Sequence, residues 1–330
     1  MPKLSLDAVE TLARDALLGA GASTLQAESV ARSTWRAERD GVRSHGLMYV
    51  PIYAEHVRCG KVDGTAEPTV ETPKPGLVRV DAASGFAHAA IDCGFNALLT
   101  AARGQGIAMM TVYHSYNCGV LGHHAERLAD EGLVGLCFTN APASIAPTGG
   151  SKPVIGTNPF ALAVPGSQGK RFTIDQSASA IAKSEIMLRS RQGEAIEPGW
   201  ALDADGNETT DPDAALKGSM VPSGGAKGFG AGLLVEVFAA ALSGAVLGKD
   251  ASPFSGTAGG PPHTGQAFIA IDPGAASGGA FAERMGALVE ALTAQEGTRL
   301  PGSRRVAARK TTADGVDVDD ALLARIKAFI

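Results

Sequence analysis

Residues 156–165 read Gly-Thr-Asn-Pro-Phe-Ala-Leu-Ala-Val-Pro, a polar turn followed directly by an apolar run. A turn rich in Gly, Asn and Pro that leads into such a run is typical of a loop at the end of a buried strand. Loops held on a rigid strand often carry ligand-binding groups. We therefore expect residues 160–164 to form a core strand and the turn before them to face a ligand.

Further short apolar runs occur on both sides of that stretch. The runs that favour β-strands are residues 77–80, 108–112, 134–138, 172–174 and 268–271. Helical periodicity separates several of them, at about 86–104, 120–131 and 227–243. This alternation predicts a mixed α/β core with a buried sheet. No Gly-x-Gly-x-x-Gly motif follows a predicted strand, so the dinucleotide fingerprint of Rossmann folds is absent.

The first third of the chain has a helical pattern instead. Residues 5–18 are amphipathic, a second helix is expected from Ser23 to Gly41, and a third over residues 47–58. Ser23 and Gln26 have the spacing of a capping box. Residues 191–226 are polar and rich in Gly and Pro, so we expect a long irregular excursion over the surface there.

The composition limits the classes of function. Of 330 residues, 45% are hydrophobic and 19% are charged, which is enough for a sizeable core. The net charge is −5 and no long cluster of Lys and Arg occurs, which argues against nucleic acid as a partner. No apolar run approaches 18 residues and no leader is recognisable, so we expect a protein away from membranes. The four cysteines have neither CxxC nor zinc-like spacing, which favours reduced thiols in the cytoplasm and no metal site.

Two stretches contain groups suited to proton transfer. Ser44-His45-Gly46 lies just beyond a predicted helix end, where an imidazole can exchange a proton near neutral pH or simply cap helix carbonyls. Asp175 follows a predicted strand, where an aspartate is as often a helix N-cap as a catalytic group. Spacing alone leaves both alternatives open.

Three further stretches suit ligand binding. The run from Tyr113 to Gly122 links a predicted strand to a helix, a place where backbone N–H groups bind phosphate or carboxamide groups. Within and after it, His114 is expected to be an ordinary loop residue, and His123 and His124 to be surface residues. Gly224-Gly225-Ala226-Lys227-Gly228 precedes a helix, and residues 299–305 carry three arginines.

These stretches, in this order, resemble the malate/L-lactate dehydrogenase family of non-Rossmann type. That family includes sulfolactate dehydrogenases, ureidoglycolate dehydrogenases and Δ1-piperideine-2-carboxylate/Δ1-pyrroline-2-carboxylate reductases. The resemblance implies a mixed α/β fold with a buried mixed sheet flanked by helices. It also implies three parts: a helical part at 1–75 that carries Ser44-His45-Gly46, an α/β core at 76–290 that binds cofactor and substrate, and a segment at 291–330 that closes over the cofactor.

The same resemblance implies a site. His45 would exchange a proton with the substrate, and Ser44 and Asp175 would complete a relay. The cofactor would be NAD or NADP, with a preference for NADP because of the arginines near the C-terminus, and the chain would form a homodimer. The residues implied to bind the cofactor are Asn117, Cys118, Gly119, Val120, Leu121, Thr157, Asn158, Lys227, Gly228, Pro301, Gly302 and Arg304. Those implied to bind a small carboxylate substrate are Tyr49, Thr139 and Asn140.

Two positions depart from the family pattern. Many members have histidine where this chain has Asn117, so His45 is expected to handle the proton here. Several members have arginine at the position of Tyr49, where it would clamp the substrate carboxylate with two hydrogen bonds. Tyrosine offers one neutral hydrogen bond, so either another cation takes the substrate carboxylate or the substrate differs.

These departures bear on the reaction. We favour interconversion of a 2-hydroxy acid of the malate, lactate or sulfolactate type and its 2-oxo acid, with hydride transfer to or from a nicotinamide. The alternative is reduction of a cyclic 2-imino acid. A Ser-His-Asp hydrolase built on Ser44, His45 and Asp175 is a remote alternative, because no Gly-x-Ser-x-Gly elbow surrounds the serine.

Overall fold

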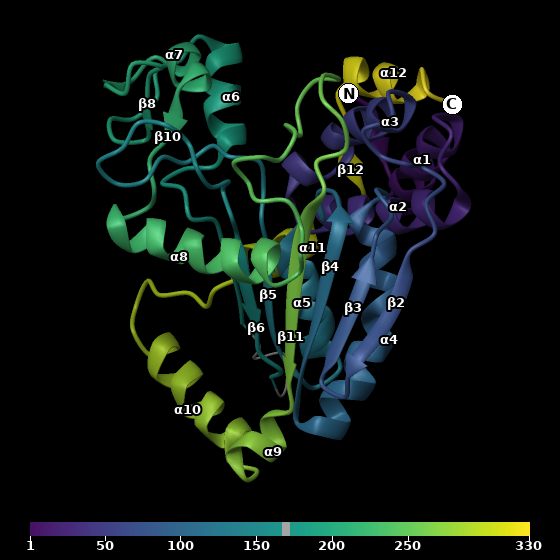
Figure 1. Cartoon of the computed structure of the whole chain (residues 1–330), viewed down its shortest axis with the longest axis vertical. Coiled ribbons are helices and arrows are strands. Elements are labelled where there is room, and N and C mark those ends of the chain that lie inside the picture. The colour runs from purple at the N-terminus through teal and green to yellow at the C-terminus, as the bar shows by residue number, and fades with distance from the viewer. Residues whose placement is uncertain (167–171) are drawn as a thin grey trace.

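A seven-stranded sheet forms the centre of the computed structural model, which describes residues 1–166 and 172–330 (Figure 1). Its strand order is β2-β3-β4-β11-β5-β6-β7. Its strands are β2 (Thr69–Lys74), β3 (Leu77–Asp81), β4 (Ile107–Ser115), β5 (Val134–Thr139), β6 (Phe160–Ala163), β7 (Thr173–Gln176) and β11 (Thr264–Ile271). Strands β3 and β4 pair in parallel, and the other neighbours in this order pair antiparallel. Each apolar run expected to be a strand lies in one of these elements to within a residue.

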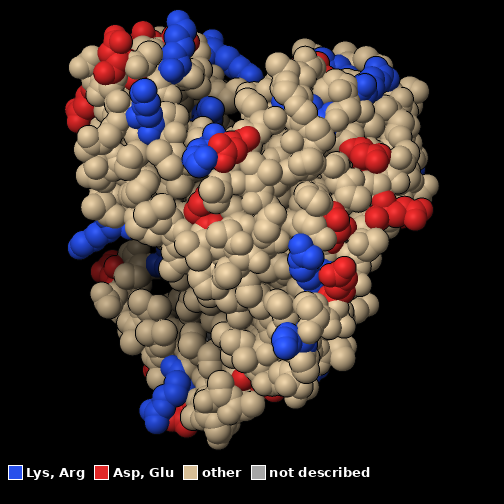
Figure 2. All heavy atoms as spheres, in the orientation of Figure 1, with Lys and Arg blue, Asp and Glu red and all other residues tan. Residues whose placement is uncertain are grey.

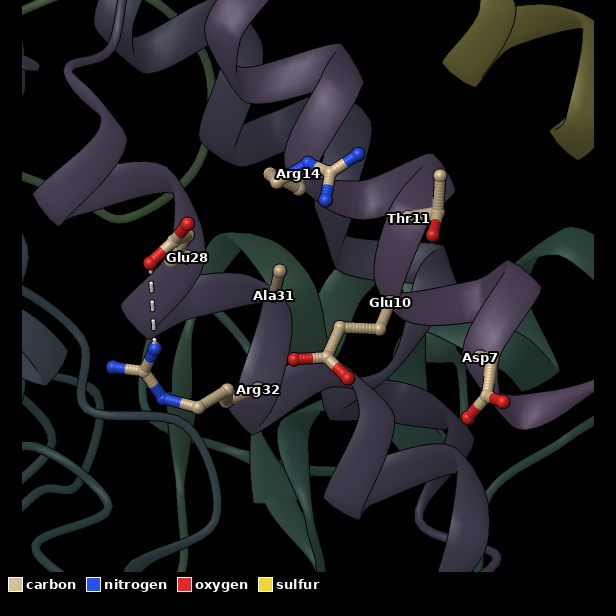
Figure 3. A pocket seen from close by; sticks show the side chains of 7 residues that line it. All are labelled: Asp7, Glu10, Thr11, Arg14, Glu28, Ala31 and Arg32. Atoms are coloured by element: carbon tan, nitrogen blue, oxygen red, sulfur yellow. Dashed lines mark ion pairs between the residues drawn. The ribbon is translucent and has the colours of Figure 1, made fainter.

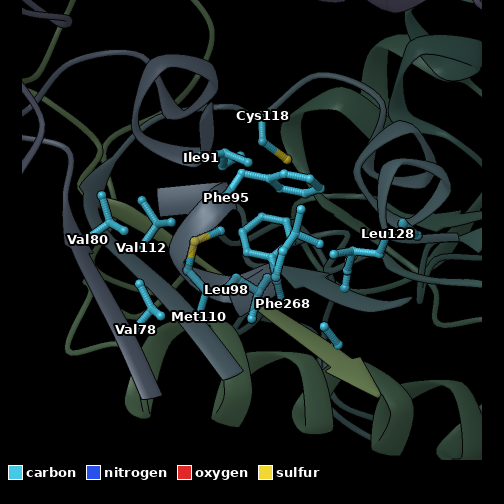
Figure 4. Close-up of a cluster of buried hydrophobic side chains, with 14 of the residues drawn as sticks. Val78, Val80, Ile91, Phe95, Leu98, Met110, Val112, Cys118, Leu128 and Phe268 are labelled. Carbon is cyan, nitrogen blue, oxygen red and sulfur yellow. The ribbon is translucent and has the colours of Figure 1, made fainter. Parts of the chain in front are cut away.

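Helices cover both faces of this sheet. Helices α4 (Ala87–Gln105) and α5 (Leu121–Asp130) pack on one face, and α8 (Ala226–Glu236) with its π-helical continuation η4 (Val237–Ala241) packs on the other. Figure 4 shows the apolar layer beneath α4 and α5, where Phe268 of β11 lies at the centre. Full burial of one such large apolar side chain stabilises the fold by roughly 1.5–3 kcal/mol. The predicted fold class is confirmed.

Glycines let the helices approach the sheet closely. A Cβ atom at Gly94 of α4 would lie 2.6 Å from both Met110 Sδ and Val80 Cγ2. A Cβ atom at Gly135 of β5 would lie 2.8 Å from Leu128 Cβ of α5. Any larger residue at either position would push a helix away from the sheet and open the apolar layer.

The helical part at the N-terminus is closed by residues from the other end of the chain. Helices α1 (Leu6–Gly19), α2 (Thr24–Arg39) and α3 (Val50–Arg58) are joined by α12 (Asp320–Lys327). Strand β1 (Lys3–Leu4) pairs antiparallel with β12 (Val316–Asp317). The apolar core of this part comprises Val9, Ala13, Ala16, Ala31, Leu47, Val50, Val316, Val318 and Ile326. Both termini lie side by side at this end of the molecule (Figure 1).

The capping box predicted at Ser23 is half right. Ser23 Oγ accepts a hydrogen bond from the N–H of Gln26, as an N-cap should. The Gln26 side chain, however, does not return to Ser23. It is fully buried, donating to the carbonyl of Ala66 at 2.7 Å and accepting from the N–H of Phe86 at 3.0 Å. Gln26 therefore ties the helical part to the segments around the sheet.

The expectation of an irregular excursion over 191–226 is right about the surface, because most of these residues are exposed, and wrong about the lack of regular structure. After α6 (Lys183–Gln192), this segment forms β8 (Ala201–Leu202), β9 (Glu208–Thr209), α7 (Pro212–Lys217) and β10 (Ser219–Met220), with β8 at the centre of a small sheet. Apolar residues of this small unit pack on Ile145 and Ile155, which come from far earlier in the chain. A local sequence pattern does not reveal a core that is completed by distant residues.

The remaining elements connect these parts. Two 3-10 turns, η1 (Arg43–His45) and η2 (Leu47–Tyr49), link α2 to α3. Helices α9 (Pro273–Ser277) and α10 (Phe281–Thr293) extend below the sheet, and α11 (Ser303–Thr311) returns behind it (Figure 1). Among the helices of the two described ranges, none is long and apolar enough to cross a membrane.

Candidate active site

The turn that carries His45 is held in place by the buried carboxylate of Glu38. Glu38 Oε1 accepts a hydrogen bond from the N–H of Leu47 at 2.7 Å, and the Glu38 side chain lies directly against Gly46, where no Cβ fits. His45 itself is half-buried, with Nδ1 fully covered and without a hydrogen-bond partner. Burial, with a smaller contribution from His123, lowers the pKa of His45 to about 4. The imidazole is therefore neutral at pH 7 when the site is empty.

A row of aromatic rings leads away from His45. The centroids of His45 and Tyr49 are 6.3 Å apart, and those of Tyr49 and Tyr53 are 4.7 Å apart. Burial raises the pKa of Tyr49 to about 12 and that of Tyr53 well above its ordinary value. The Tyr53 hydroxyl donates to Asn117 Oδ1 at 3.2 Å. The row thus joins His45 to the loop after β4, and both hydroxyl groups stay protonated.

The loop that begins at Asn117 is tightly packed. Gly119 has a φ of +71° and donates its N–H to Asn117 Oδ1 at 2.7 Å. A Cβ atom on Gly119 would lie 2.8 Å from Ser33 Oγ and 2.9 Å from His88 Nε2, so glycine is required here on two grounds. The buried Cys118 places its carbonyl 2.9 Å from His124 Nε2.

The expectation that His123 and His124 are surface residues is wrong. Both are buried on α5, because this short helix is covered by the sheet on one side and by α2 and α11 on the other. His123 Nε2 lies 3.1 Å from Asp40 Oδ2, and burial lowers the pKa of His124 to about 3. Among the described residues, no group of three or more His, Cys, Asp or Glu is arranged to hold a metal ion.

A cavity of about 490 Å³ opens beside this loop. Its volume lies within the range of small-molecule and cofactor sites. The residues that line it are Val42, Val120, Thr173, Asp175, Arg299, Leu300, Pro301, Gly302, Arg304 and Arg305. The N–H of Thr173 donates to the carbonyl of Pro301 at 3.2 Å, which fixes the C-terminal loop on the strand that carries Asp175. The structure therefore brings Asp175 together with four predicted cofactor-binding residues, Val120, Pro301, Gly302 and Arg304.

The carboxylate of Asp175 already has partners within the protein. Its Oδ2 accepts from the N–H of Gly122 at 3.0 Å and lies 3.4 Å from Arg305 Nη1. Burial raises the pKa of Asp175, and Arg305 opposes this effect. No hydrogen bond joins Asp175 to His45 within the part of the chain that the structure describes. A hydrolase triad requires the aspartate on Nδ1 of the histidine, and that atom of His45 has no partner.

A buried carboxylate anchors α11 behind the cavity. Asp40 accepts two hydrogen bonds from Arg309, at 2.8 and 2.7 Å, and one each from Arg39 and His123. Burial alone would raise the pKa of Asp40, but these donors lower it well below its usual range. Sequence analysis missed this residue, because an Asp at a helix end gives no sign that it is fully buried.

Other predicted site residues serve the fold through their side chains. Asn158 is fully buried; its Nδ2 donates to Glu236 Oε2 at 2.6 Å and its Oδ1 accepts from the N–H of Ala141. Asn140 Oδ1 accepts from the N–H of Gly265 at 2.8 Å, and its Nδ2 donates to the carbonyl of Val246. In both amides the oxygen and the nitrogen each have at least one partner in the protein, and a role of Asn140 or Asn158 in ligand binding stays a prediction.

The remaining predicted residues lie around these two amides and at the start of α8. Thr139 Oγ1 lies within hydrogen-bond reach of the carbonyl of Gly265, and Thr157 is half-buried. Lys227 is exposed in the first turn of α8, with no ion pair in the described ranges. Gly228 packs against the backbone of Ser223, where no Cβ fits. Their roles in cofactor or substrate binding stay predictions.

A second hollow, of about 260 Å³, lies between α1 and α2, away from these groups. Figure 3 shows that it is lined by Asp7, Glu10, Thr11, Arg14, Glu28, Ala31 and Arg32. Its charged side chains include the Glu28–Arg32 pair, with 3.9 Å between Oε2 and Nη1. Mixed charges on the solvent side of two helices are an ordinary protein surface, and we assign no function to this hollow.

Comparisons with known proteins agree on one family. Residues 4–327 match the family described as malate/L-lactate dehydrogenase. The chain is 42% identical to a (2R)-3-sulfolactate dehydrogenase (NADP(+)) of Chromohalobacter salexigens, covering 99% of this chain and 97% of that protein. It is 41% identical to a Δ1-pyrroline-2-carboxylate reductase of Ancylobacter novellus, with the same coverage. Its fold matches the crystal structure of Δ1-piperideine-2-carboxylate reductase from Pseudomonas syringae with a TM-score of 0.94 over the whole of both chains, at 33% identity.

Proposed function

This chain belongs to the malate/L-lactate dehydrogenase family, and from that premise we propose that it is an NADP-dependent oxidoreductase that acts on a carbon next to a carboxylate. The bound nicotinamide would supply or accept the hydride. Arg299 and Arg304, at the cavity beside Pro301 and Gly302, would hold the 2′-phosphate, because guanidinium groups bind phosphate with paired hydrogen bonds. The cavity's volume and cationic rim fit this group.

His45 would exchange the proton. At a pKa of about 4 the imidazole carries no proton to donate at pH 7. A substrate carboxylate bound beside it would raise this pKa, since a nearby negative charge favours the charged imidazole. Substrate binding would therefore favour the protonated form of His45, which is the form that can donate a proton. Ser44, the adjacent residue, would take part in the relay that the family resemblance implies. Asp175 would join this relay only if its carboxylate turned from Gly122 and Arg305 toward His45.

The observation that carries the choice of substrate is the neutrality of the aromatic row that leads away from His45. Tyr49 and Tyr53 keep their hydroxyl protons, and the row ends at the amide of Asn117. Neutral donors suit a substrate that balances its own charge. A cyclic 2-imino acid becomes such a zwitterion when its ring nitrogen takes the proton from His45, and addition of the hydride to the neighbouring carbon then gives the neutral amine. We therefore propose reduction of a cyclic 2-imino acid to the amino acid as the activity.

A second candidate is the 2-hydroxy acid reaction favoured by the sequence. The arginines at the cavity would then have to hold a second acidic group of the substrate, a sulfonate or a carboxylate, in addition to the 2′-phosphate of the cofactor. The 42% identical relative is a sulfolactate dehydrogenase, and this similarity supports the second candidate. The two candidates differ in where the charge of the substrate is balanced.

One assay separates them. NADPH oxidation is followed at matched concentrations of Δ1-pyrroline-2-carboxylate, Δ1-piperideine-2-carboxylate, pyruvate, oxaloacetate and sulfopyruvate. We expect kcat/KM for a cyclic imine to exceed that of each 2-oxo acid by at least about tenfold, a difference of about 1.4 kcal/mol in transition-state binding. A higher value for sulfopyruvate or oxaloacetate would select the second candidate. No oxidation with any of them would refute the proposed reaction.

We also propose that two copies associate through the face of α8, in the cytoplasm. Large apolar side chains are exposed there, namely Leu233, Leu234, Val237 and Leu242. Charged groups are sparse across the middle of this face (Figure 2). A contiguous apolar patch of this kind is typical of a subunit interface. All four cysteines are free thiols, in keeping with a reducing compartment. Light scattering of the protein and of Leu234→Glu measures whether the face holds a dimer together.

A further inference from the structure

The side-chain amide of Asn117 is held in one orientation. Its Oδ1 accepts from the N–H of Gly119 at 2.7 Å and from the hydroxyl of Tyr53 at 3.2 Å. A backbone N–H can only donate, so the amide atom that faces it must be the oxygen. Two donors therefore fix which end of the amide points into the protein and which end points out.

The second donor is itself immobile. The Tyr53 side chain is only 1% exposed, and its ring makes edge contacts with Phe86 and Tyr116. Burial raises the pKa of Tyr53 well above its ordinary value, so the hydroxyl keeps its proton throughout the working pH range. Tyr53 therefore remains a hydrogen-bond donor to Asn117 at neutral pH.

This arrangement leaves Asn117 Nδ2 free. The side chain is partly exposed, and Nδ2 has no hydrogen-bond partner among the described residues. The Tyr49 hydroxyl, next in the aromatic row toward His45, likewise has none. Both groups are donors without charge, and both lie on the side of the site that contains the proton donor. Unpaired donors beside a catalytic group are available to a ligand.

We infer that Asn117 Nδ2 and the Tyr49 hydroxyl bind the substrate carboxylate, and that Tyr53 is the positioning residue that holds Asn117 in place. This inference rests on the proposed function and names the groups that select its substrate. It also moves Asn117 from the cofactor, where the family resemblance had it, to the substrate. A neutral clamp holds one carboxylate without attracting a second acidic group, so it favours monocarboxylates over diacids.

The inference is tested with Asn117→Asp. This variant keeps an oxygen for the donors from Gly119 and Tyr53 but replaces the outward NH₂ group with a negatively charged oxygen. Hydrogen bonds to a charged group contribute about 1.5–3 kcal/mol, so we expect KM for the imino acid to rise by roughly 10–150-fold or more. The Kd for NADPH, measured by quenching of protein fluorescence, should change by less than about threefold.

The positioning role has its own variant and control. Tyr53→Phe removes one of the two donors to Asn117 Oδ1, and we expect KM to rise by roughly threefold to tenfold with kcat unchanged. Tyr116→Phe is the matched control. Tyr116 lies in the same ring cluster, but its hydroxyl bonds to His56 Nδ1 and not to Asn117. A merely structural role for these rings would raise KM equally in both variants, and this result would overturn the assignment of Tyr53.

Binding of pyrrole-2-carboxylate, a planar carboxylate that cannot be reduced, separates this inference from the proposed reaction. We expect the protein–NADPH complex to bind it and Asn117→Asp to lose that binding. If Asn117→Asp instead weakens NADPH and keeps the analogue, Asn117 is a cofactor residue and the inference is wrong. If the analogue behaves as expected but no imino or oxo acid is reduced, the proposed function fails and the carboxylate clamp stands.

Discussion

The two flanks of the candidate site use polar groups in opposite ways. On one flank, Asp40, Asp175, Arg305 and Arg309 are joined to one another and to Glu126 by ion pairs and hydrogen bonds. On the other flank, His45, Tyr49 and Asn117 each keep a polar atom without a hydrogen-bond partner in the two described ranges. Paired charges hold elements together, and unpaired neutral groups remain for a ligand. Substitutions in the charged flank should therefore affect stability, and substitutions in the neutral flank should affect turnover.

The neutral flank is tested first by His45→Ala. Loss of a general acid commonly lowers the rate by roughly 10²–10⁴-fold, and we expect a decrease of that size in kcat. NADPH affinity and the melting temperature should barely change, because His45 Nδ1 makes no hydrogen bond with any residue that the structure describes. Steady-state kinetics and fluorescence titration measure both quantities. Rates near those of the unmodified protein would mean that the proton is transferred elsewhere.

The charged flank is tested by Asp40→Ala. This change leaves Arg309 and Arg39 without their main partner in a buried position, and loss of one member of a buried ion pair destabilises by about 3–5 kcal/mol. Urea unfolding of this variant and of His45→Ala measures the contrast between the flanks. Equal free energies of unfolding for the two variants would contradict the proposed difference between the two flanks.

Acid should weaken the fold through buried imidazoles. Burial lowers the pKa of His88 to about 4, and neither of its ring nitrogens has a hydrogen-bond partner among the described residues. The unfolded chain, with a histidine pKa near 6.5, then binds more protons between pH 6.5 and 4. The free energy of unfolding therefore keeps its full value above pH 6.5 with respect to His88. It decreases as the pH drops toward 4, by as much as about 3 kcal/mol from this group. Urea unfolding at a series of pH values should give a flatter profile for His88→Leu than for the unmodified protein.

The smallest expected effect concerns the cofactor. Arg304 is exposed at the cavity, whereas Arg305 is 11% exposed and occupied by Asp175. Arg304→Ala should weaken NADPH by roughly tenfold, the size of one lost charge-assisted hydrogen bond, and leave NADH unchanged. Parallel titration with both cofactors decides the matter. Equal weakening would show that Arg304 does not read the 2′-phosphate.

Much of the fold follows from the sequence because its signals are local. The strands around the sheet, the helices between them and the Ser23 cap depend on neighbours within a few residues. The small unit around β8 escaped prediction because Ile145 and Ile155 complete its core. His123 and His124 were misplaced because burial of a short helix depends on α11, which lies nearly 200 residues further along the chain.

The same limit applies to the site. Sequence motifs led to His45, Asn117 and Arg304, but they did not reveal that Tyr53 orients Asn117 or that Arg305 is occupied. Orientation and occupancy depend on side chains that meet only in the folded protein. A sequence motif predicts which chemical groups a site contains. Contacts in the folded protein determine which atoms of those groups can still bind a ligand.

The pairing of β1 with β12 has a consequence for how the protein is made. Strand β12 and helix α12 complete the core on which the turn carrying His45 rests. During synthesis, the apolar core of the first three helices can therefore be completed only after residue 326 has left the ribosome. Until then their apolar faces are open to chaperones and to neighbouring nascent chains. Joining the two termini with a short linker and opening the chain in an exposed loop would let the helical part close early, and faster recovery of activity after refolding would measure the cost of that delay.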